Sequence, residues 1–129
     1  MTRTSALIYS DSYQDYKFSP GHPLKPERLL LTAELIKAYG LPGLPGMRIV
    51  EPRLATDEEL RLVHDQAYID KVREFSDPEI GRDYAPGWGL GTGDNPVFPR
   101  MHEASATIAG GALVAARMIM EGELDHALH

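Results

Sequence analysis

Three short apolar segments, separated by segments with helical periodicity, constrain the fold of this chain most. They lie at residues 5–9, 47–50 and 124–128, and each has the length of a strand. The order strand, helix, strand, helices, strand is typical of an α/β fold with a mostly parallel sheet. Because such a sheet must be covered on both faces, three strands are few, and we expect the fold to be incomplete within these residues.

The first helix is bounded by clear start and stop signals. Pro26 suits a first helical position, where a missing N–H costs nothing, and Gly40 and Pro42 end the helix after residue 39. The apolar positions expected to face the core recur at steps of three and four: Leu29, Ala33, Ile36 and Tyr39. The pattern predicts an amphipathic helix over 26–39.

Three further helices are expected before the last strand. Thr56 and Glu59 fit a capping box that opens a short helix ending near residue 64, and Asp65 can cap the next one. The apolar stripe of that helix contains Tyr68, Ile69, Val72 and Phe75. A long helix over 99–121 has a face of small residues that permits close approach by another element: Ala104, Ala109, Gly110, Gly111 and Ala115.

Residues 77–99 show no periodicity and are long for a loop in a compact domain, which is typical of functional or disordered segments. The aromatic residues Tyr84, Trp88 and Phe98 indicate an ordered loop. The glycine-rich run 89–93 lacks the preceding strand and the following helix of a dinucleotide-binding loop, so we expect its glycines to serve tight turns.

Composition excludes several classes of function. The chain has 13 Lys and Arg against 19 Asp and Glu, a net charge of −6, and no basic cluster. We therefore expect neither a nucleic-acid nor a membrane partner. The absence of cysteine removes disulfides, thiolate nucleophiles and cysteine zinc sites. With no apolar run long enough for a membrane span or a leader, we expect a cytoplasmic protein, with a folded surface of roughly 6,800 Å² by mass scaling.

A few polar residues are candidates for chemistry, each with a simpler alternative. Asp94 can form an Asx turn or accept hydrogen bonds from a substrate's N–H groups. Arg28 lies in a first helical turn, where it is either solvated beside Glu27 or partly buried against a carboxylate or carbonyl groups. His22 lies between Gly21 and Pro23 as a hydrogen-bonded loop residue or a base. The chain's 5 histidines show no metal-ligand spacing, so we expect no metal site within it.

Three segments together resemble the histone deacetylase superfamily. Residues 21–28 read Gly-His-Pro-Leu-Lys-Pro-Glu-Arg, similar to the family's G-H-P-x-K-P-x-R segment. His64, Tyr68 and Ile69 follow its H-x-x-Y-I/L segment. Residues 94–98 resemble D-x-P-V-F, and Gly110-Gly111 resembles the later helical glycine pair. The resemblance is closest to bacterial members of the acetoin-utilisation type.

The resemblance implies an arginase/deacetylase-like three-layer α/β fold and a zinc-dependent hydrolase that removes acetyl groups from lysine or related amines. The family's Asp-x-His ligands, its histidine pair and its catalytic tyrosine have no counterpart in these residues, and a Gly-Gly-x-His-His segment is expected just after His129. The resemblance therefore implies residues 1–129 as the N-terminal part of a deacetylase-like domain, with no catalytic residue or zinc ligand of its own.

Four positions match family residues that surround the active site. Asp94 matches a rim aspartate that accepts hydrogen bonds from the substrate backbone. Arg28 matches an arginine near the cavity for the acetate product, and His22 and Pro23 match the first active-site loop. The implied substrate is an acetylated lysine in a protein or a small acetylated amine, and the implied partner is the C-terminal part of the same domain. Two alternatives stay open: a deacetylase acting on acetylpolyamines, and a non-catalytic binding module complete at 129 residues.

Overall fold

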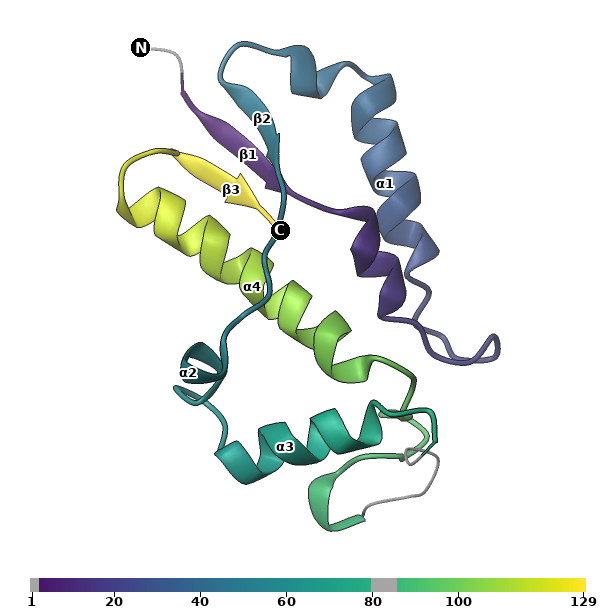
Figure 1. Cartoon of the computed structure of the whole chain (residues 1–129). Coiled ribbons are helices and arrows are strands. Elements are labelled where there is room, and N and C mark those ends of the chain that lie inside the picture. The colour runs from purple at the N-terminus through teal and green to yellow at the C-terminus, as the bar shows by residue number, and fades with distance from the viewer. Residues whose placement is uncertain (1–2, 80–85) are drawn as a thin grey trace.

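A three-stranded parallel sheet forms the centre of the molecule. The computed structural model describes residues 3–79 and 86–129 (Figure 1). Strand β1 (Ser5–Ile8) lies between β2 (Met47–Val50) and β3 (His126–Leu128), in the order β2-β1-β3. Both pairings are parallel, with Ser5 opposite Met47 on one side and opposite His126 on the other. The predicted parallel α/β architecture is confirmed.

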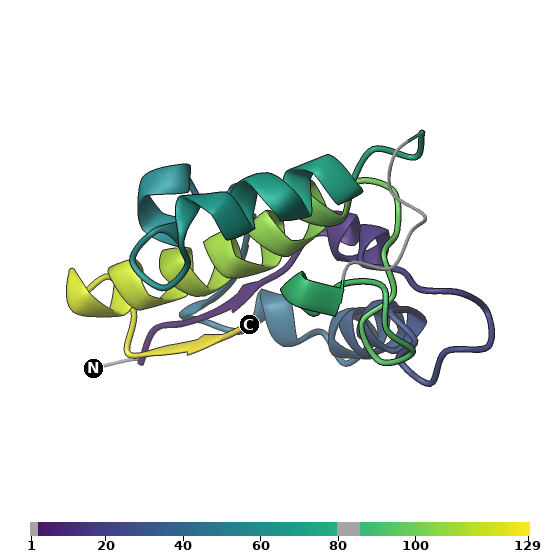
Figure 2. The same ribbon diagram turned by 90° about the horizontal axis from the view of Figure 1, so that it is seen from below.

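Alternate side chains of β1 point into two different cores. Ala6 and Ile8 pack with Val114 and Met118 of helix α4 (Met101–Met120). Leu7 and Tyr9 pack on the opposite face, where Ala33 of helix α1 (Glu27–Ala38) contributes. The two-residue period of a strand places these side chains on opposite faces. Figure 2 shows the resulting layers, with α4 above the sheet and α1 below it.

Helix α1 covers its face of the sheet less fully than its sequence predicts. Of the four predicted core positions only Ala33 is buried and Ile36 is half-buried, whereas Leu29 and Tyr39 are 41% and 75% exposed. The prediction that all four face the core was wrong. The helix meets the sheet through a narrow contact centred on the small Ala33, so its flanking apolar side chains reach solvent. Its end was predicted correctly, since Gly40 adopts a left-handed φ of 70°.

The remaining elements are short. They are η1 (Asp11–Asp15), η2 (Leu41–Gly43), α2 (Asp57–Leu60), α3 (Gln66–Phe75) and η3 (Pro86–Trp88). The predicted capping box is confirmed: the Glu59 carboxylate accepts the Thr56 N–H at 2.8 Å, and the Thr56 hydroxyl accepts the Glu59 N–H at 3.3 Å. Asp65 occupies the N-cap of α3, but its side chain makes no capping hydrogen bond.

The predicted face of small residues on α4 is confirmed as a site of close approach. A Cβ atom on Gly110 would collide with the carbonyl oxygen of Arg53 and lie 2.8 Å from the amide nitrogen of Ala55. That amide donates a hydrogen bond of 2.9 Å to the Ala106 carbonyl. A Cβ on Gly111 would meet the Tyr13 hydroxyl and the His129 ring. The two glycines thus let segments that follow β1, β2 and β3 touch the same helix.

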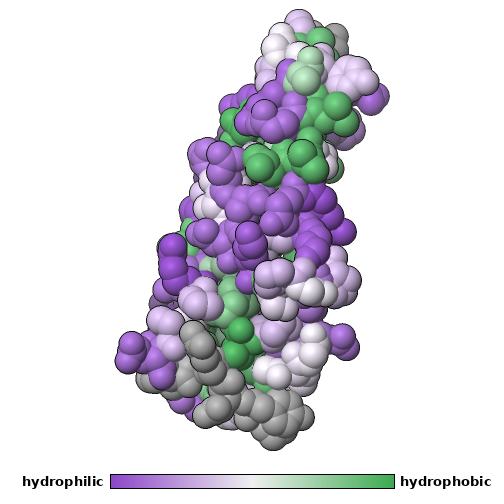
Figure 3. All heavy atoms as spheres, turned by 90° about the vertical axis from the view of Figure 1, so that its right-hand side faces the viewer, coloured by the Kyte–Doolittle hydropathy of each residue, from purple (hydrophilic) through white to green (hydrophobic). Residues whose placement is uncertain are grey.

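The molecule leaves much apolar surface exposed. Its accessible area is 8323 Å², above the roughly 6,800 Å² expected from its mass. Figure 3 shows apolar side chains on the α1 side of the molecule, among polar ones. On α1 and η2 the exposed fractions are 69% for Leu31, 57% for Leu35 and 39% for Leu41. Within the described residues, no helix is both long and apolar enough to cross a membrane.

Candidate functional site

The loop that carries Asp94 is closed by its neighbours. The Gly91 N–H donates to the Asn95 carbonyl at 2.9 Å, and the Asn95 N–H donates to the Thr92 hydroxyl at 3.0 Å. Gly91 has a φ of 80°, which favours glycine. The Asp94 side chain is exposed at the tip and makes no hydrogen bond within the described residues. Thr92, and not an Asx turn of Asp94, therefore stabilises the loop and leaves the carboxylate free to accept hydrogen bonds.

The other predicted site residues lie on the adjacent segment before α1. The Nδ1 atom of His22 accepts a hydrogen bond from the Leu24 N–H at 3.1 Å, and its ring lies 4.4 Å from that of Phe18. This is the hydrogen-bonded loop histidine expected from sequence. Pro23 is exposed, and Arg28 is exposed in the first turn of α1. None of Asp94, His22, Pro23 and Arg28 is among the residues that line the cavity described next. Their roles in binding stay predictions.

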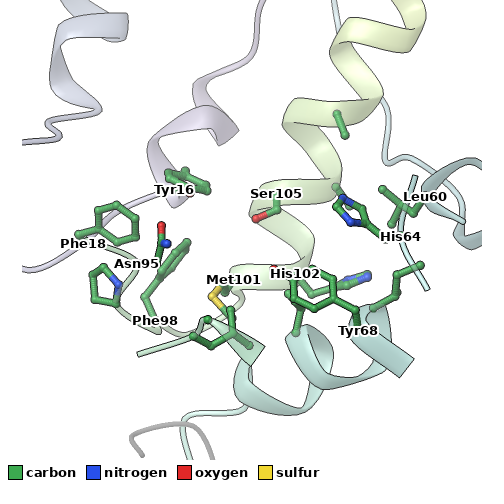
Figure 4. Close-up of a pocket in the computed structure, with 17 residues that line it drawn as sticks. Tyr16, Phe18, Leu60, His64, Tyr68, Asn95, Phe98, Met101, His102 and Ser105 are labelled. Atoms are coloured by element: carbon green, nitrogen blue, oxygen red, sulfur yellow. The ribbon is translucent and has the colours of Figure 1, made fainter. Parts of the chain in front are cut away.

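A cavity of about 290 Å³ lies between η1, α3, the 89–98 loop and the start of α4 (Figure 4). It is lined by Tyr16, Phe18, Leu60, His64, Tyr68, Ile69, Val72, Gly89, Leu90, Asn95, Pro96, Phe98, Met101, His102, Ser105, Ala106 and Ala109. Segments that follow the carboxyl ends of β1 and β2 form most of it, which is where ligands of parallel α/β sheets bind. Two of the three predicted motif segments meet there, since both 64–69 and 94–98 contribute.

Sequence reasoning missed several polar residues of this cavity. In Figure 4 Ser105 points into the cavity from α4, and Asn95 lies across from it beside Phe18 and Phe98. His64 is exposed but also lines the cavity, and His102 is half-buried in its wall. The available signal was the position of Asn95 directly after Asp94, although its direction depends on the loop's closure.

His102 is also part of a polar network between helices. Its Nε2 atom lies 3.2 Å from the Arg73 guanidinium, which pairs with Asp57 at 2.7 Å. Its backbone N–H donates to the Ser76 hydroxyl at 2.7 Å. Burial and the nearby positive charge of Arg73 lower the pKa of His102. The imidazole thus favours its neutral form, in which Nε2 can accept from Arg73.

A second group of polar residues lies at the carboxyl ends of the three strands. The Tyr9 and Tyr13 rings pack edge-on with centroids 6.0 Å apart, and the His129 ring lies 5.5 Å from Tyr13. Within the described residues, the buried hydroxyl of Tyr13 has no hydrogen-bond partner. Burial and the charge of Glu51 raise the pKa of Tyr13 to about 12, so this hydroxyl stays protonated at neutral pH.

The residues present do not fit the zinc ion that the resemblance implies. Within residues 3–79 and 86–129, no three histidine, aspartate or glutamate side chains lie close enough together to hold a metal ion. His126 and His129 lie three positions apart on and after β3, a spacing that sends side chains of a strand to opposite faces.

The fold and the cavity define the class of protein first. A parallel sheet between helical layers, with the cavity formed beyond the carboxyl ends of its strands, is an α/β fold of the arginase/deacetylase kind. The chain belongs to the histone deacetylase family, because the family model of the histone deacetylase domain matches residues 22–129.

Known relatives agree with this membership. The chain is 43% identical over 125 residues to an acetoin utilization protein of Bacillus subtilis, covering 97% of this chain and 32% of the relative. It is 41% identical over 125 residues to one of Staphylococcus aureus, with the same coverage. It is 39% identical over all 129 residues to one of Staphylococcus xylosus, covering 33% of that protein. The chain thus spans about a third of the length of these curated relatives.

Proposed function

We propose that residues 1–129 form the N-terminal part of a deacetylase domain that hydrolyses the acetyl amide of lysine or a similar amine. The observation that carries this proposal is the meeting of motif segments 64–69 and 94–98 at one cavity, with Asp94 exposed next to the lining residue Asn95. The family match over 22–129 supports it. We propose zinc as the cofactor, held by residues other than those described here, and the cytoplasm as the compartment.

In this proposal Asp94 binds the substrate. Its carboxylate is exposed at the tip of a loop fixed by Gly91, Thr92 and Asn95, so it can accept hydrogen bonds from peptide N–H groups without first giving up a partner. A hydrogen bond to a charged group contributes about 1.5–3 kcal/mol. Fixing the carboxylate before binding reduces the entropy lost on association.

The neighbouring segment supplies the wall of the site. The ring contact of His22 with Phe18 and its hydrogen bond to Leu24 hold the backbone around Pro23 in one conformation. Arg28 is exposed and makes no side-chain hydrogen bond or ion pair among the described residues. Its guanidinium therefore remains free to bind the acetate product once the rest of a deacetylase domain covers this face.

The experiment is to read the gene beyond the codon for His129 and to express the extended product. We expect an open frame that encodes Gly-Gly-x-His-His and a product that deacetylates an acetyl-lysine peptide. A product that acts on acetylpolyamines but not on peptides would replace the substrate with the small-amine alternative. A frame that stops after His129, together with a monodisperse, cooperatively folding 14.3 kDa monomer, would establish a binding module and overturn the proposal.

A further inference from the structure

The cavity differs from the rest of the molecule in charge. Charged residues make up 25% of the chain, yet none of the cavity's described lining residues is Asp, Glu, Lys or Arg. Its walls are mainly aromatic and aliphatic, with Tyr16, Phe18, Tyr68 and Phe98 as the largest side chains. A charged group placed there would lose part of its hydration and would meet no opposite charge in the lining, which is unfavourable. The lining therefore selects for an uncharged occupant.

Two polar side chains of the cavity face each other, apart from His64, His102 and the two tyrosines that also line it. Ser105 points in from α4, and Asn95 lies opposite (Figure 4). Neither side chain makes a hydrogen bond within the part of the chain that the structure describes. A carboxamide offers both a donor and an acceptor, which matches the N–H and C=O of a peptide group. The cavity thus combines an apolar body with groups suited to a neutral amide.

The 91–95 loop carries both the proposed rim residue Asp94 and a lining residue of the cavity. Asp94 is exposed at the tip, and the next residue, Asn95, lines the cavity. Adjacent Cα atoms are about 3.8 Å apart, close to the spacing of residues in an extended peptide. A peptide residue next to one that binds Asp94 is therefore within reach of Asn95 and of the cavity that it lines. The cavity volume of about 290 Å³ lies at the small end for ligand sites, so it suits one side chain.

We propose that this cavity binds an uncharged aromatic or branched aliphatic side chain that flanks the acylated lysine of a peptide substrate, with Asn95 pairing to the adjoining peptide group. The inference rests on the proposed function and adds the class of peptide that the site takes. Apolar contact with Tyr68, Phe98 and Met101 supplies the binding energy, and Asn95 fixes the register of the peptide.

The first test measures binding without catalysis. Side-chain NMR signals of Met101, Tyr68 and Ser105 are followed while N-acetyl-phenylalanine methylamide is added to the 129-residue chain. The matching lysine and aspartate derivatives serve as charged probes. We expect saturable shifts with the phenylalanine probe and at least tenfold weaker binding of both charged probes. Equal binding of all three probes, or no binding of the phenylalanine probe to the folded chain, would overturn the inference.

Three variants test whether the phenylalanine probe binds in this cavity. Asn95→Leu removes the carboxamide at an exposed position where folding should survive, and we expect about fivefold weaker binding, the effect of one neutral hydrogen bond. Ala109→Leu places a larger side chain on the cavity wall and should abolish binding. Thr32→Val on the exposed side of α1 is the control and should bind like the parent chain. Unchanged binding in Asn95→Leu would contradict the role given to Asn95.

A second measurement separates this inference from the proposed function and also decides it if the chain alone aggregates. With the extended product, kcat/KM is compared for acetyl-lysine peptides that differ only in one flanking residue, phenylalanine against glutamate. We expect at least a tenfold preference for phenylalanine that falls in Asn95→Leu. Deacetylation with no such preference would leave the function standing and refute the inference, whereas absence of deacetylation with selective probe binding would refute the function alone.

Discussion

Gly110 of α4 lies directly against the backbone of Arg53, so that a Cβ at this position would overlap the Arg53 carbonyl oxygen. Both contacting atoms belong to the backbone: the Arg53 carbonyl oxygen and, at 2.8 Å, the Ala55 amide nitrogen. Neither can move aside as the end of a flexible side chain can. This contact joins the segment after β2 to α4 and thereby fixes the start of α2, whose following residues reach the cavity. The position therefore requires glycine.

Gly110→Ala should destabilise the protein by about 1–3 kcal/mol, the usual cost of overpacking, even though alanine favours a helix by about 1 kcal/mol. The measurement is the urea midpoint of unfolding. Gly43→Ala is the matched control, since its Cβ would meet no atom within 4 Å and its φ is not positive. We expect that variant to gain about 0.4–1 kcal/mol. A Gly110→Ala protein as stable as the parent would contradict the close contact.

Tyr13→Phe should make the protein more stable at neutral pH, by up to about 1–3 kcal/mol, because it removes a buried hydroxyl without a partner among the described residues. It should also change the alkaline limb. The folded-state pKa of Tyr13 is raised from 10.0 to about 12. The free energy of unfolding of the parent should therefore fall as pH rises from 10 toward 12, and this fall should be absent in the variant. Urea unfolding measured from pH 7 to 12 tests both effects.

Tyr39→Phe is the control for this variant, because Tyr39 is 75% exposed. We expect it to leave both the neutral stability and the alkaline limb unchanged. A loss of stability in Tyr13→Phe at neutral pH would show instead that the Tyr13 hydroxyl has a partner in solution.

Glu59→Gln should make the free energy of unfolding depend less on pH below 4.5. The Arg53 guanidinium donates to both carboxylate oxygens, at 2.7 Å and 2.5 Å, and together with the Thr56 N–H lowers the pKa of Glu59 from 4.5 to about 2. A depressed carboxyl pKa gives stability that is present above 4.5 and lost as pH falls toward 2. Unfolding midpoints between pH 2 and 6 should fall more steeply in the parent than in the variant. The neighbouring Glu58→Gln, 3.6 Å from Arg61 and 77% exposed, should retain the steep limb.

Asp94→Asn should lower kcat/KM of the extended product for acetyl-lysine peptides about tenfold or more, because one charged acceptor worth about 1.5–3 kcal/mol is lost. The effect should be absent with an acetylpolyamine, which has no peptide N–H groups for the carboxylate to bind. Steady-state kinetics with both substrates test this prediction. An unchanged kcat/KM for peptides would remove Asp94 from the substrate rim.

The order of strands and helices along the chain follows from sequence, because strand and helix periodicities and capping residues are local properties. The capping box at Thr56 and the end of α1 at Gly40 are examples. The burial of α1 could not be predicted, since periodicity shows which side chains share a face but not how much neighbouring structure covers that face. The 69% exposure of Leu31 could therefore not be predicted from the periodicity. The prediction for Tyr84 lies outside the described residues.

The candidate site, too, could be predicted only in part from the sequence. The motif residues around Asp94 and His64 could be identified from sequence, because they follow family patterns. Their meeting at one cavity depends on the path of α3 and the 89–98 loop, which spacing does not determine. Asn95 and Ser105 escaped notice because each side chain's direction is set by tertiary contacts: loop closure through Thr92 for the first, and the packing of α4 for the second.

The most direct test of the central claim uses the purified 129-residue chain with added zinc. Elemental analysis and turnover of an acetyl-lysine peptide are measured together, with the extended product as the positive control. The chain should retain no stoichiometric zinc and show no turnover, whereas the extended product should show both. Equimolar zinc and peptide deacetylation by the 129-residue chain alone would contradict the claim that the catalytic groups lie outside it.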